Sequence, residues 1–245
     1  MKKTIVITDV TRMKEPRVCV FGIDTATKEG IRPTGYNDKE ISEEYCVKNN
    51  IALFNEMEFN LTRRLYPKPP HTEDWYFDPE IPPRFLRTLS DKEQRQLLEN
   101  ISSESIKSLF GIEIHENRYV NEEEGKRSLG TIRPKSISFV RYSPKEDEKF
   151  EYRITFQDQM GDEYDLPVTD LMFRKHCDAL KEKVLSHGRI GAQIQETFEK
   201  ILKDGSIFLR IGLTRPYKKE GDACPKCWLQ ISSIHTFPRY YNYEL

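Results

Sequence analysis

Short apolar, β-branched runs between polar stretches predict several β-strands in the N-terminal third of the chain. TIVIT (residues 4–8) and RVCVFGI (17–23) are β-branched and apolar, and the polar stretch DVTRMKEP (9–16) separates them. Such runs, bounded by polar segments and glycines, are typical of β-strands. NNIALFNEMEFNL (49–61) fits either a strand or a helix, and its β-rich neighbours favour a strand. YPKPPHTEDWYFDPEIPP (66–83) contains six prolines, which exclude a long helix or a central strand and predict an extended loop.

A helical segment follows the proline-rich loop. Ser90 is a suitable N-cap residue, and Glu93 completes a capping box three residues later. Apolar residues then recur at helical spacing as far as Gly111, where the helix is expected to end: Leu97, Leu98, Ile101, Ile106 and Leu109. The acidic stretch EIHENRYVNEEE (113–124) predicts a hydrated linker or an exposed hairpin.

The second half of the chain again begins with strands. ISFVRY (137–142) precedes FEYRITF (150–156), in which apolar and polar residues alternate strictly, as on a half-buried strand. A turn is expected around Gly161. Two helices should follow, one capped by Asp170 and ending at Gly188, the other from about Gly191 to Asp204. SIFLRIGL (206–213) and CWLQISSIH (227–235) predict two closing strands.

This order of elements predicts a mainly β protein with helical insertions (α+β), built as two OB-like small β-barrels joined by a helical segment. We expect a first OB-like unit at 1–89, a helical and acidic connector at 90–125, and a second unit with two inserted helices at 126–245. The 245 residues suit one large domain or two of about 100 residues. An aromatic content of 11% argues against disorder.

The dipeptide Arg-Pro occurs three times, each time a few residues after a glycine: Arg32-Pro33, Arg133-Pro134 and Arg215-Pro216. One interpretation is structural, with proline ending a strand edge and glycine forming a bulge. The other is functional, with each unit presenting a guanidinium at a comparable strand end. An arginine there can bind a phosphate or stack on a base.

Net charge and cysteine usage limit the classes of partner and compartment. A formal net charge of −1 gives no global attraction to nucleic acid or membranes, so such a role requires local patches. Five scattered cysteines do not form a disulfide framework, and no apolar run is long enough to span a membrane. We therefore expect a reduced, cytoplasmic protein without a membrane segment.

Two local stretches are basic. Residues 126–153 hold eight Lys or Arg against four acids, and residues 205–219 hold four bases and no acid. Arg141, Arg153 and Arg210 lie on expected strands, where they are interleaved with aromatic residues (Phe139, Tyr142, Tyr152 and Phe208). Arginines among aromatic rings suit single-stranded nucleic acid, because the charges follow phosphates and the rings stack on bases. The alternative is a solvated polar face beside an aromatic core.

Further candidate residues carry less specific signals. Trp75 and Trp228 could stack on bases, or belong to the core or to a domain contact. Cys224 and Cys227 form a single CxxC, which offers two of the four ligands that zinc normally needs, so we expect no metal. The acids in EDW and DQMGDEYD could hold magnesium in a nuclease, but no P-loop, nucleophile-elbow or zincin motif occurs.

Several blocks of the sequence resemble the dual OB-containing domain family. They are RVCVFGIDTATKEGIRPT (17–34), PPHTEDW (69–75), LRIGLTRPY (209–217) and CWLQISSIHTFPRY (227–240). The resemblance implies two OB folds, nucleic-acid binding and a bacterial origin, with some members linked to phage-defence or nucleic-acid-processing loci. It supplies no catalytic residue and no cofactor.

Together these observations predict a non-catalytic protein that binds single-stranded DNA or RNA. The expected binding residues are Arg32, Arg133, Arg141, Arg153, Arg210, Arg215, Trp75 and Trp228. An adaptor that recruits a nuclease or helicase through the same barrels is the first alternative, and a metal-dependent nuclease is the second. The sequence leaves the oligomeric state open.

Overall fold

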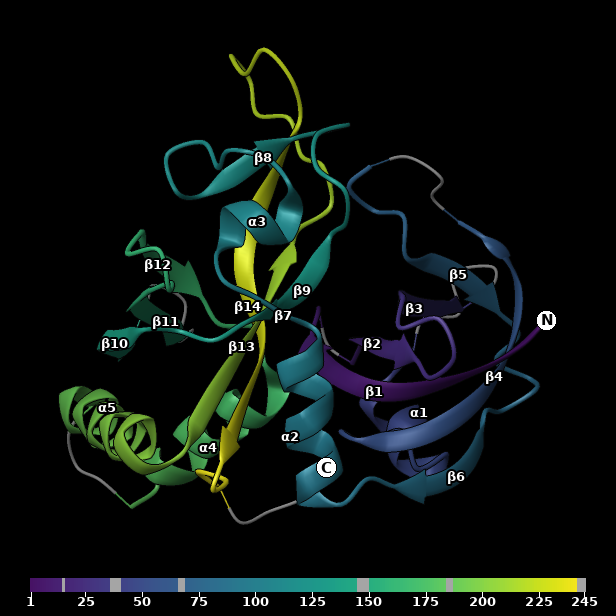
Figure 1. Ribbon diagram of the computed structural model, residues 1–245, viewed down its shortest axis with the longest axis horizontal. Helices are drawn as coiled ribbons and strands as arrows, with labels where there is room; N and C mark the ends of the chain where they lie inside the picture. The colour runs from purple at the N-terminus through teal and green to yellow at the C-terminus, as the bar shows by residue number, and fades with distance from the viewer. Residues whose placement is uncertain (15, 36–40, 66–68, 145–149, 184–186, 242–245) are drawn as a thin grey trace.

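The N-terminal strands close into a five-stranded barrel, on the right of Figure 1. The computed structural model describes the chain except residues 15, 36–40, 66–68, 145–149, 184–186 and 242–245. The barrel strands are β1 (Lys2–Arg12), β2 (Val18–Asp24), β3 (Gly30–Gly35), β4 (Asn55–Arg64) and β5 (Asp74–Phe77). They pair in the order β1-β2-β3-β5-β4, and β4 returns to β1. This is the five-stranded arrangement of an OB fold, with helix α1 (Glu43–Lys48) between β3 and β4 in the chain.

A bulge and a glycine allow these strands to bend. The register between β1 and β2 shifts between Ile7 and Asp9, which inserts one residue and increases the local twist. A Cβ at Gly22 would lie 2.6 Å from the backbone oxygen of Val6, so no other residue fits at this position of β2. Strand β6 (Arg84–Thr88) extends the sheet from the free side of β4.

The second unit is a half-barrel. A three-stranded meander contains β10 (Ser136–Pro144), β11 (Phe150–Gln157) and β12 (Glu163–Pro167). A five-stranded sheet has the order β7 (Ser102–Ser103), β9 (Leu129–Ile132), β13 (Ser206–Leu213), β14 (Lys226–Phe237) and β8 (Tyr119–Asn121). The two sheets meet at a parallel bridge between Val168 and Ile231, which is the relation that β3 and β5 have in the first barrel.

Helix α5 (His187–Asp204) packs along β10. The helix thus covers the edge of β10 that would pair with β13 if the barrel were closed. Its apolar residues Ile190, Ile194 and Phe198 belong to the main core of this unit. A Cβ at Gly191 would lie 2.3 Å from the backbone oxygen of Val140, so the helix approaches the strand at a glycine. Helix α4 (Leu171–Lys181) is capped by Asp170, as predicted.

The connector contains two helices rather than the single one predicted. α2 (Asp91–Asn100) begins with the predicted capping box of Ser90 and Glu93, and α3 (Ile106–Phe110) ends at Gly111. Between them, β7 joins β9 as a parallel strand, and Ser102 donates its hydroxyl to Leu98 O in the last turn of α2. Within residues 113–124, His115 and Tyr119 form an isolated bridge around a turn, and β8 pairs with β14 with Val120 buried, so the stretch is not a hydrated linker.

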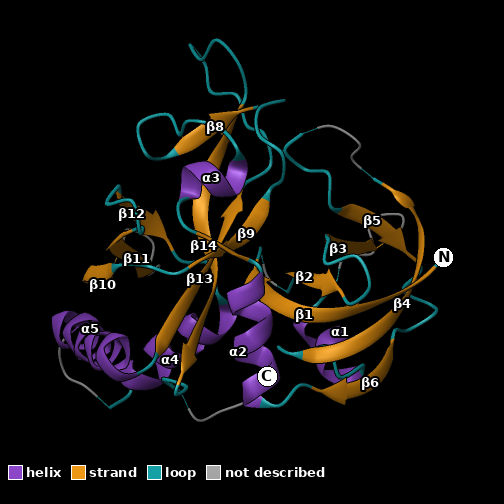
Figure 2. Ribbon diagram, viewed as in Figure 1, coloured by secondary structure: helices purple, strands orange, loops and turns teal. Residues whose placement is uncertain are grey.

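The prediction of an extended loop throughout the proline-rich stretch is also wrong. Asp74–Phe77 is a strand inside the barrel, with β3 on one side and β4 on the other. The prolines lie before and after these four residues, so each side of the strand can pair. Figure 2 shows the two strand-rich units side by side, with α2 between them. None of the helices described in the structure is long and apolar enough to cross a membrane.

Candidate nucleic-acid interface

The outer face of the β10–β12 sheet presents two arginines directly opposite each other. Arg141 of β10 is in register with Arg153 of β11. Strict alternation along β11 directs Ile154 and Phe156 into the core, so Arg153 and Thr155 lie on the other face. The register shifts between Ile137 and Phe139, and Phe139 is therefore exposed on the same side of β10, at 49%.

Local acids hold these arginines in place. Arg153 donates from Nε to Asp165 Oδ2 at 2.9 Å and from Nη2 to the backbone oxygen of the same residue. Arg141 Nη1 lies 3.7 Å from Glu151 Oε2, and its guanidinium carbon is 5.7 Å from the centre of the Phe139 ring. The face thus joins an exposed aromatic ring to two oriented guanidinium groups, which can contact a base and neighbouring phosphates.

Arg210, expected on the same face, is instead buried between the two units. Its side chain is 1% exposed, donates from Nε to Asp9 Oδ2 at 2.9 Å and from Nη1 to Thr131 Oγ1 at 2.7 Å. The guanidinium carbon also lies 5.1 Å from the centre of the Phe21 ring. A side chain without access to solvent cannot bind a nucleic acid, so the prediction for Arg210 is wrong.

Arg32 and Arg215 converge on one buried carboxylate. Arg32 Nε lies 2.5 Å from Asp74 Oδ1, and Arg215 Nη1 pairs with Asp74 Oδ2. Arg32 also donates to Ser128 Oγ, which donates in turn to Glu73. Asp74 is completely buried, whereas the Arg215 side chain is 46% exposed. Arg32 therefore stabilises the contact between the units, and only Arg215 is well exposed to solvent.

This junction brings together three of the sequence blocks that carry the family resemblance: GIRPT (30–34), PPHTEDW (69–75) and LTRPY (213–217). His71 of the second block points its Nε2 toward Leu213 O at 3.4 Å. Burial and the two nearby arginines, Arg32 and Arg215, lower the pKa of His71 to about 4, so the ring is neutral. The blocks thus describe a contact between barrels.

The expectation that the Arg-Pro dipeptides occupy comparable strand ends of separate units is wrong. Arg32 lies inside β3, whereas Arg133 and Arg215 follow β9 and β13, which are antiparallel neighbours in one sheet. Arg133 is exposed and its guanidinium carbon lies 5.6 Å from the Phe208 ring centre. It remains available for a phosphate, far from Arg215 along the strands.

The two tryptophans lie apart from the β10–β12 face. Trp75 on β5 packs against the core of the first barrel, with Arg64 5.2 Å from its ring centre. Trp228 on β14 is half-buried beside Tyr119, at 5.1 Å between ring centres, and Lys219 lies 5.7 Å from it. Stacking of either ring on a base stays a prediction.

The cysteine pair is divided between two environments. Cys227 is buried in the core of the second unit, and burial raises the pKa of its thiol to about 12. Cys224 is half-exposed and donates to Asn121 Oδ1 at 3.2 Å. Among the residues that the structure describes, no group of three or more His, Cys, Asp or Glu is placed to hold a metal ion.

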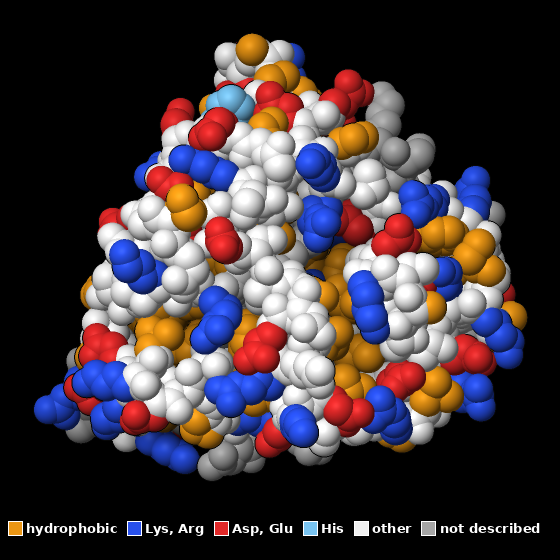
Figure 3. Space-filling model, in the orientation of Figure 1, with side chains coloured by type: hydrophobic (Ala, Val, Ile, Leu, Met, Phe, Trp, Pro, Cys, Tyr) orange, Lys and Arg blue, Asp and Glu red, His pale blue; other side chains and the backbone are white. Residues whose placement is uncertain are grey.

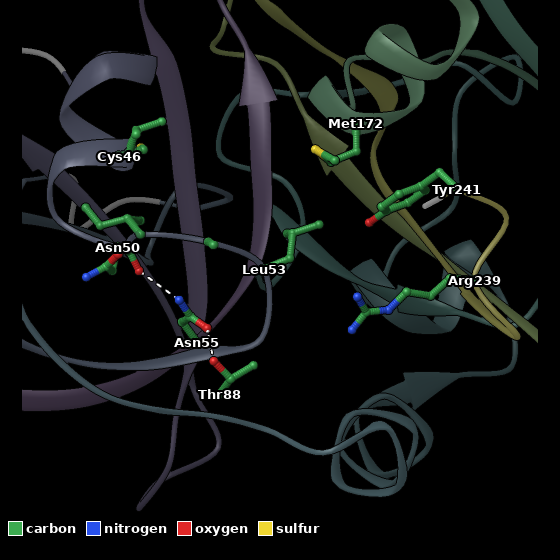
Figure 4. Close-up of a pocket in the computed structure, with 11 residues that line it drawn as sticks. Cys46, Asn50, Leu53, Asn55, Thr88, Met172, Arg239 and Tyr241 are labelled. Atoms are coloured by element: carbon green, nitrogen blue, oxygen red, sulfur yellow. Dashed lines mark hydrogen bonds between the residues drawn. The ribbon is translucent and has the colours of Figure 1, made fainter. Parts of the chain in front are cut away.

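A cavity of about 310 Å³ lies between α1 and the C-terminal segment (Figure 4). Several of its polar groups are already paired. Asn55 donates to Asn50 O and accepts from Thr88 Oγ1, as the dashed lines show. Arg239 donates to Gln94 and lies 3.6 Å from Asp91. This cavity therefore offers a ligand few free polar groups on these walls.

Sequence reasoning missed a second basic surface. Lys28, Arg64, Lys126 and Arg127 line a groove of about 420 Å³ where the first barrel meets the second unit. They come from three segments that are distant in the sequence. The adjacent pairs Arg63-Arg64 and Lys126-Arg127 are visible in the sequence, but nothing local shows that they face one groove.

Comparison of the sequence with models of protein families gives a match that agrees with this fold. The family model described as the dual OB-containing domain matches residues 3–234. No curated protein matches the chain.

Proposed function

The chain belongs to the dual OB-containing domain family, and we propose that it binds single-stranded nucleic acid through the outer face of β10–β12. OB folds bind oligonucleotides on the face of their second and third strands. In the half-barrel these strands are β11 and β12, which follow β10 in a three-stranded meander. The register pair Arg141 and Arg153 on this face is the observation that carries the proposal.

The corresponding face of the first barrel is covered, which favours the second unit as the binding unit. Phe21 and Ile23 on the outside of β2 are buried against Leu129 of β9. Arg210 lies over Phe21 from the other side of the contact. A nucleic-acid strand could reach the β2 face of the first barrel only at its margin. On the second unit, by contrast, Phe139 and Arg141 are exposed on β10.

The chemistry of the face suits a short and sequence-tolerant contact. Every base has a π-face, so Phe139 can stack on any of them at about 1–3 kcal/mol per base. Two arginines can each contact one phosphate, while Asp165 and Glu151 fix their orientation. Such a small footprint agrees with a net charge of −1. We further propose that the protein is cytoplasmic and acts in bacterial phage defence.

The proposal is tested by fluorescence anisotropy with a short labelled single-stranded oligonucleotide. Phe139→Ala should weaken binding by roughly tenfold or more, because one stacked base is lost. Phe85→Ala is the matched control, since Phe85 is 41% exposed on β6 of the other unit. Equal affinity of both variants and the unaltered protein would reject this face as the site.

The adaptor alternative makes a different prediction for the same variants. An exposed phenylalanine beside ion-paired arginines can also form the centre of a protein contact. If the unaltered protein binds no oligonucleotide, and Phe139→Ala abolishes co-purification of a nuclease or helicase from the native host, the adaptor function replaces nucleic-acid binding.

A further inference from the structure

Each of the two units supplies lining residues to the groove between them, and the floor of the groove is apolar. Figure 3 shows this hollow, with hydrophobic atoms inside it and Lys and Arg at its edges. Its volume is about 420 Å³, which lies within the range of small-molecule sites. Phe21, Ile23 and Leu129 pack together as one hydrophobic cluster beneath it, and Ile101 adds a partly buried side chain.

Four exposed cations surround this floor. Lys28 comes from the turn after β2, Arg64 from the end of β4, and Lys126 and Arg127 from the segment before β9. None of the four forms an ion pair with another residue in the part of the chain that the structure describes. Their charges are therefore available to an anionic ligand.

The positions of these cations are set by the fold. The backbone N–H of Lys126 donates to Phe110 O at 2.9 Å, and its aliphatic stem packs where a Cβ on Gly111 would lie. Lys28 donates from Nζ to Thr25 O at 2.8 Å. Arg64 lies over the ring of Trp75. A ligand would thus meet cations that are already partly ordered, which lowers the entropic cost of binding.

Acids do not neutralise this end of the groove. Glu73 is buried, and its two oxygens accept hydrogen bonds from Ser128 N at 2.7 Å and Ser128 Oγ at 2.9 Å. Arg210 at the floor is balanced by Asp9. Glu29 remains on one wall, so the four cations of the rim exceed the acid that faces them.

The excess of positive charge does not continue beyond this end. An adjoining hollow of about 430 Å³ shares Ile23, Lys28 and Ile101 with the groove and is lined by Asp24, Glu56, Glu93 and Arg87. Asp24 pairs with Lys3, and Arg87 pairs with both Glu56 and Glu93, so the charges of this hollow largely balance one another. The excess of positive charge is therefore confined to one end of the groove, which suits a ligand with its negative charge at one end.

We propose that the groove binds one nucleotide, with its phosphate at Lys126, Arg127 and Arg64 and its base against Ile101, the partly buried side chain beside the apolar floor. The nucleotide can be free in solution or can be the phosphorylated end of a strand, since both present the same chemistry. This site is separate from the β10–β12 face and does not rest on nucleic-acid binding there.

The test is calorimetric titration of adenosine 5′-monophosphate, adenosine, and one oligonucleotide with and without a 5′-phosphate. The double variant Lys126→Gln/Arg127→Gln should weaken binding of the phosphorylated ligand by roughly tenfold or more, because a charge-assisted contact is lost at each position. Lys200→Gln/Lys203→Gln is the charge-matched control, because both lysines are exposed on α5.

Each outcome decides the matter. Binding of the monophosphate but not adenosine, lost in the groove variant alone, supports a free nucleotide. Binding only of the 5′-phosphorylated oligonucleotide, with the same loss, supports a strand end. No phosphate-dependent binding, or equal loss in the control, overturns the site. Arg141→Ala/Arg153→Ala should leave groove binding unchanged, so failure of the sheet face and failure of the groove are distinguishable.

Discussion

Arg210 and Asp9 form an ion pair at 2.9 Å between the second unit and the first barrel, with exposed side-chain fractions of 1% and 2%. The carboxylate is fully engaged, since Ser232 Oγ donates to Asp9 Oδ1 at 2.7 Å and Thr8 Oγ1 donates to Oδ2 at 2.8 Å. A buried pair that forms only when the two units are in register fixes their relative orientation.

Arg210→Ala should lower the free energy of unfolding by about 3–5 kcal/mol, because it leaves the Asp9 charge buried and unpaired. Urea denaturation followed by circular dichroism measures this change. The matched control is Arg141→Ala, whose side chain is 41% exposed and should change stability by less than about 0.5 kcal/mol. Similar stabilities of the two variants would show that the ion pair does not hold the units together.

Gly191→Ala should destabilise the second unit, although alanine favours helices by about 1 kcal/mol over glycine. The new Cβ would lie 2.3 Å from Val140 O and would displace α5 from β10. Gly188→Ala, in the first turn of the same helix, meets no atom within 4 Å and should be neutral or slightly stabilising. Thermal melts of both variants compare them directly, and an equally stable Gly191→Ala protein would disprove the close contact.

Asp170 should make stability depend on pH. Burial raises its pKa to about 7, although the backbone N–H groups of Met172, Phe173 and Ile234 oppose this shift. The folded protein therefore holds a proton that the unfolded chain has released, and this contribution to stability is lost as pH rises from about 4 to 7.

Asp170→Asn should remove this dependence. The variant loses the bond to Ile234 N at every pH, but its deficit relative to the unaltered protein should shrink as pH rises from about 4 to 7. Subtraction of the two curves also removes the contribution of His235, whose pKa is lowered to about 4 by burial and which acts with the opposite sign. Parallel stability curves would contradict a raised pKa for Asp170.

Zinc should not co-purify with the protein through Cys224 and Cys227. A zinc ligand must be a thiolate, and the Cys227 thiol is buried in the apolar core with a pKa raised to about 12. Elemental analysis of protein purified without chelator measures the content. One tightly held zinc per chain, lost in Cys224→Ser, would refute this prediction.

Local signals in the sequence predicted much of the fold correctly. Strict alternation over 150–156 identified β11 and placed Arg153 on its polar face. The Ser90 and Glu93 capping box identified the start of α2, because this signal depends only on residues within one turn. The resemblance blocks and the strand pattern together predicted two OB-like units.

Contacts between distant segments could not be predicted in the same way. Every residue of β13 is buried, so the burial of Arg210 leaves no periodic signal in SIFLRIGL, and its partner Asp9 is 201 residues away. The groove cations likewise come from three segments of both halves. Arg210 is visible in the sequence only as a charged residue in an apolar run, which fits a binding residue and a buried pair equally well.

The most direct test of the β10–β12 face is the salt dependence of oligonucleotide binding by Arg141→Ala/Arg153→Ala. Each lost phosphate contact on a single strand lowers the slope of log affinity against log salt by about 0.7, so the double variant should lose about 1.4. Its melting curve should stay cooperative with a slightly lower midpoint, because Arg153 loses its bonds to Asp165, and Lys200→Gln/Lys203→Gln should keep the full slope. An unchanged affinity and slope in the folded double variant would contradict nucleic-acid binding at this face.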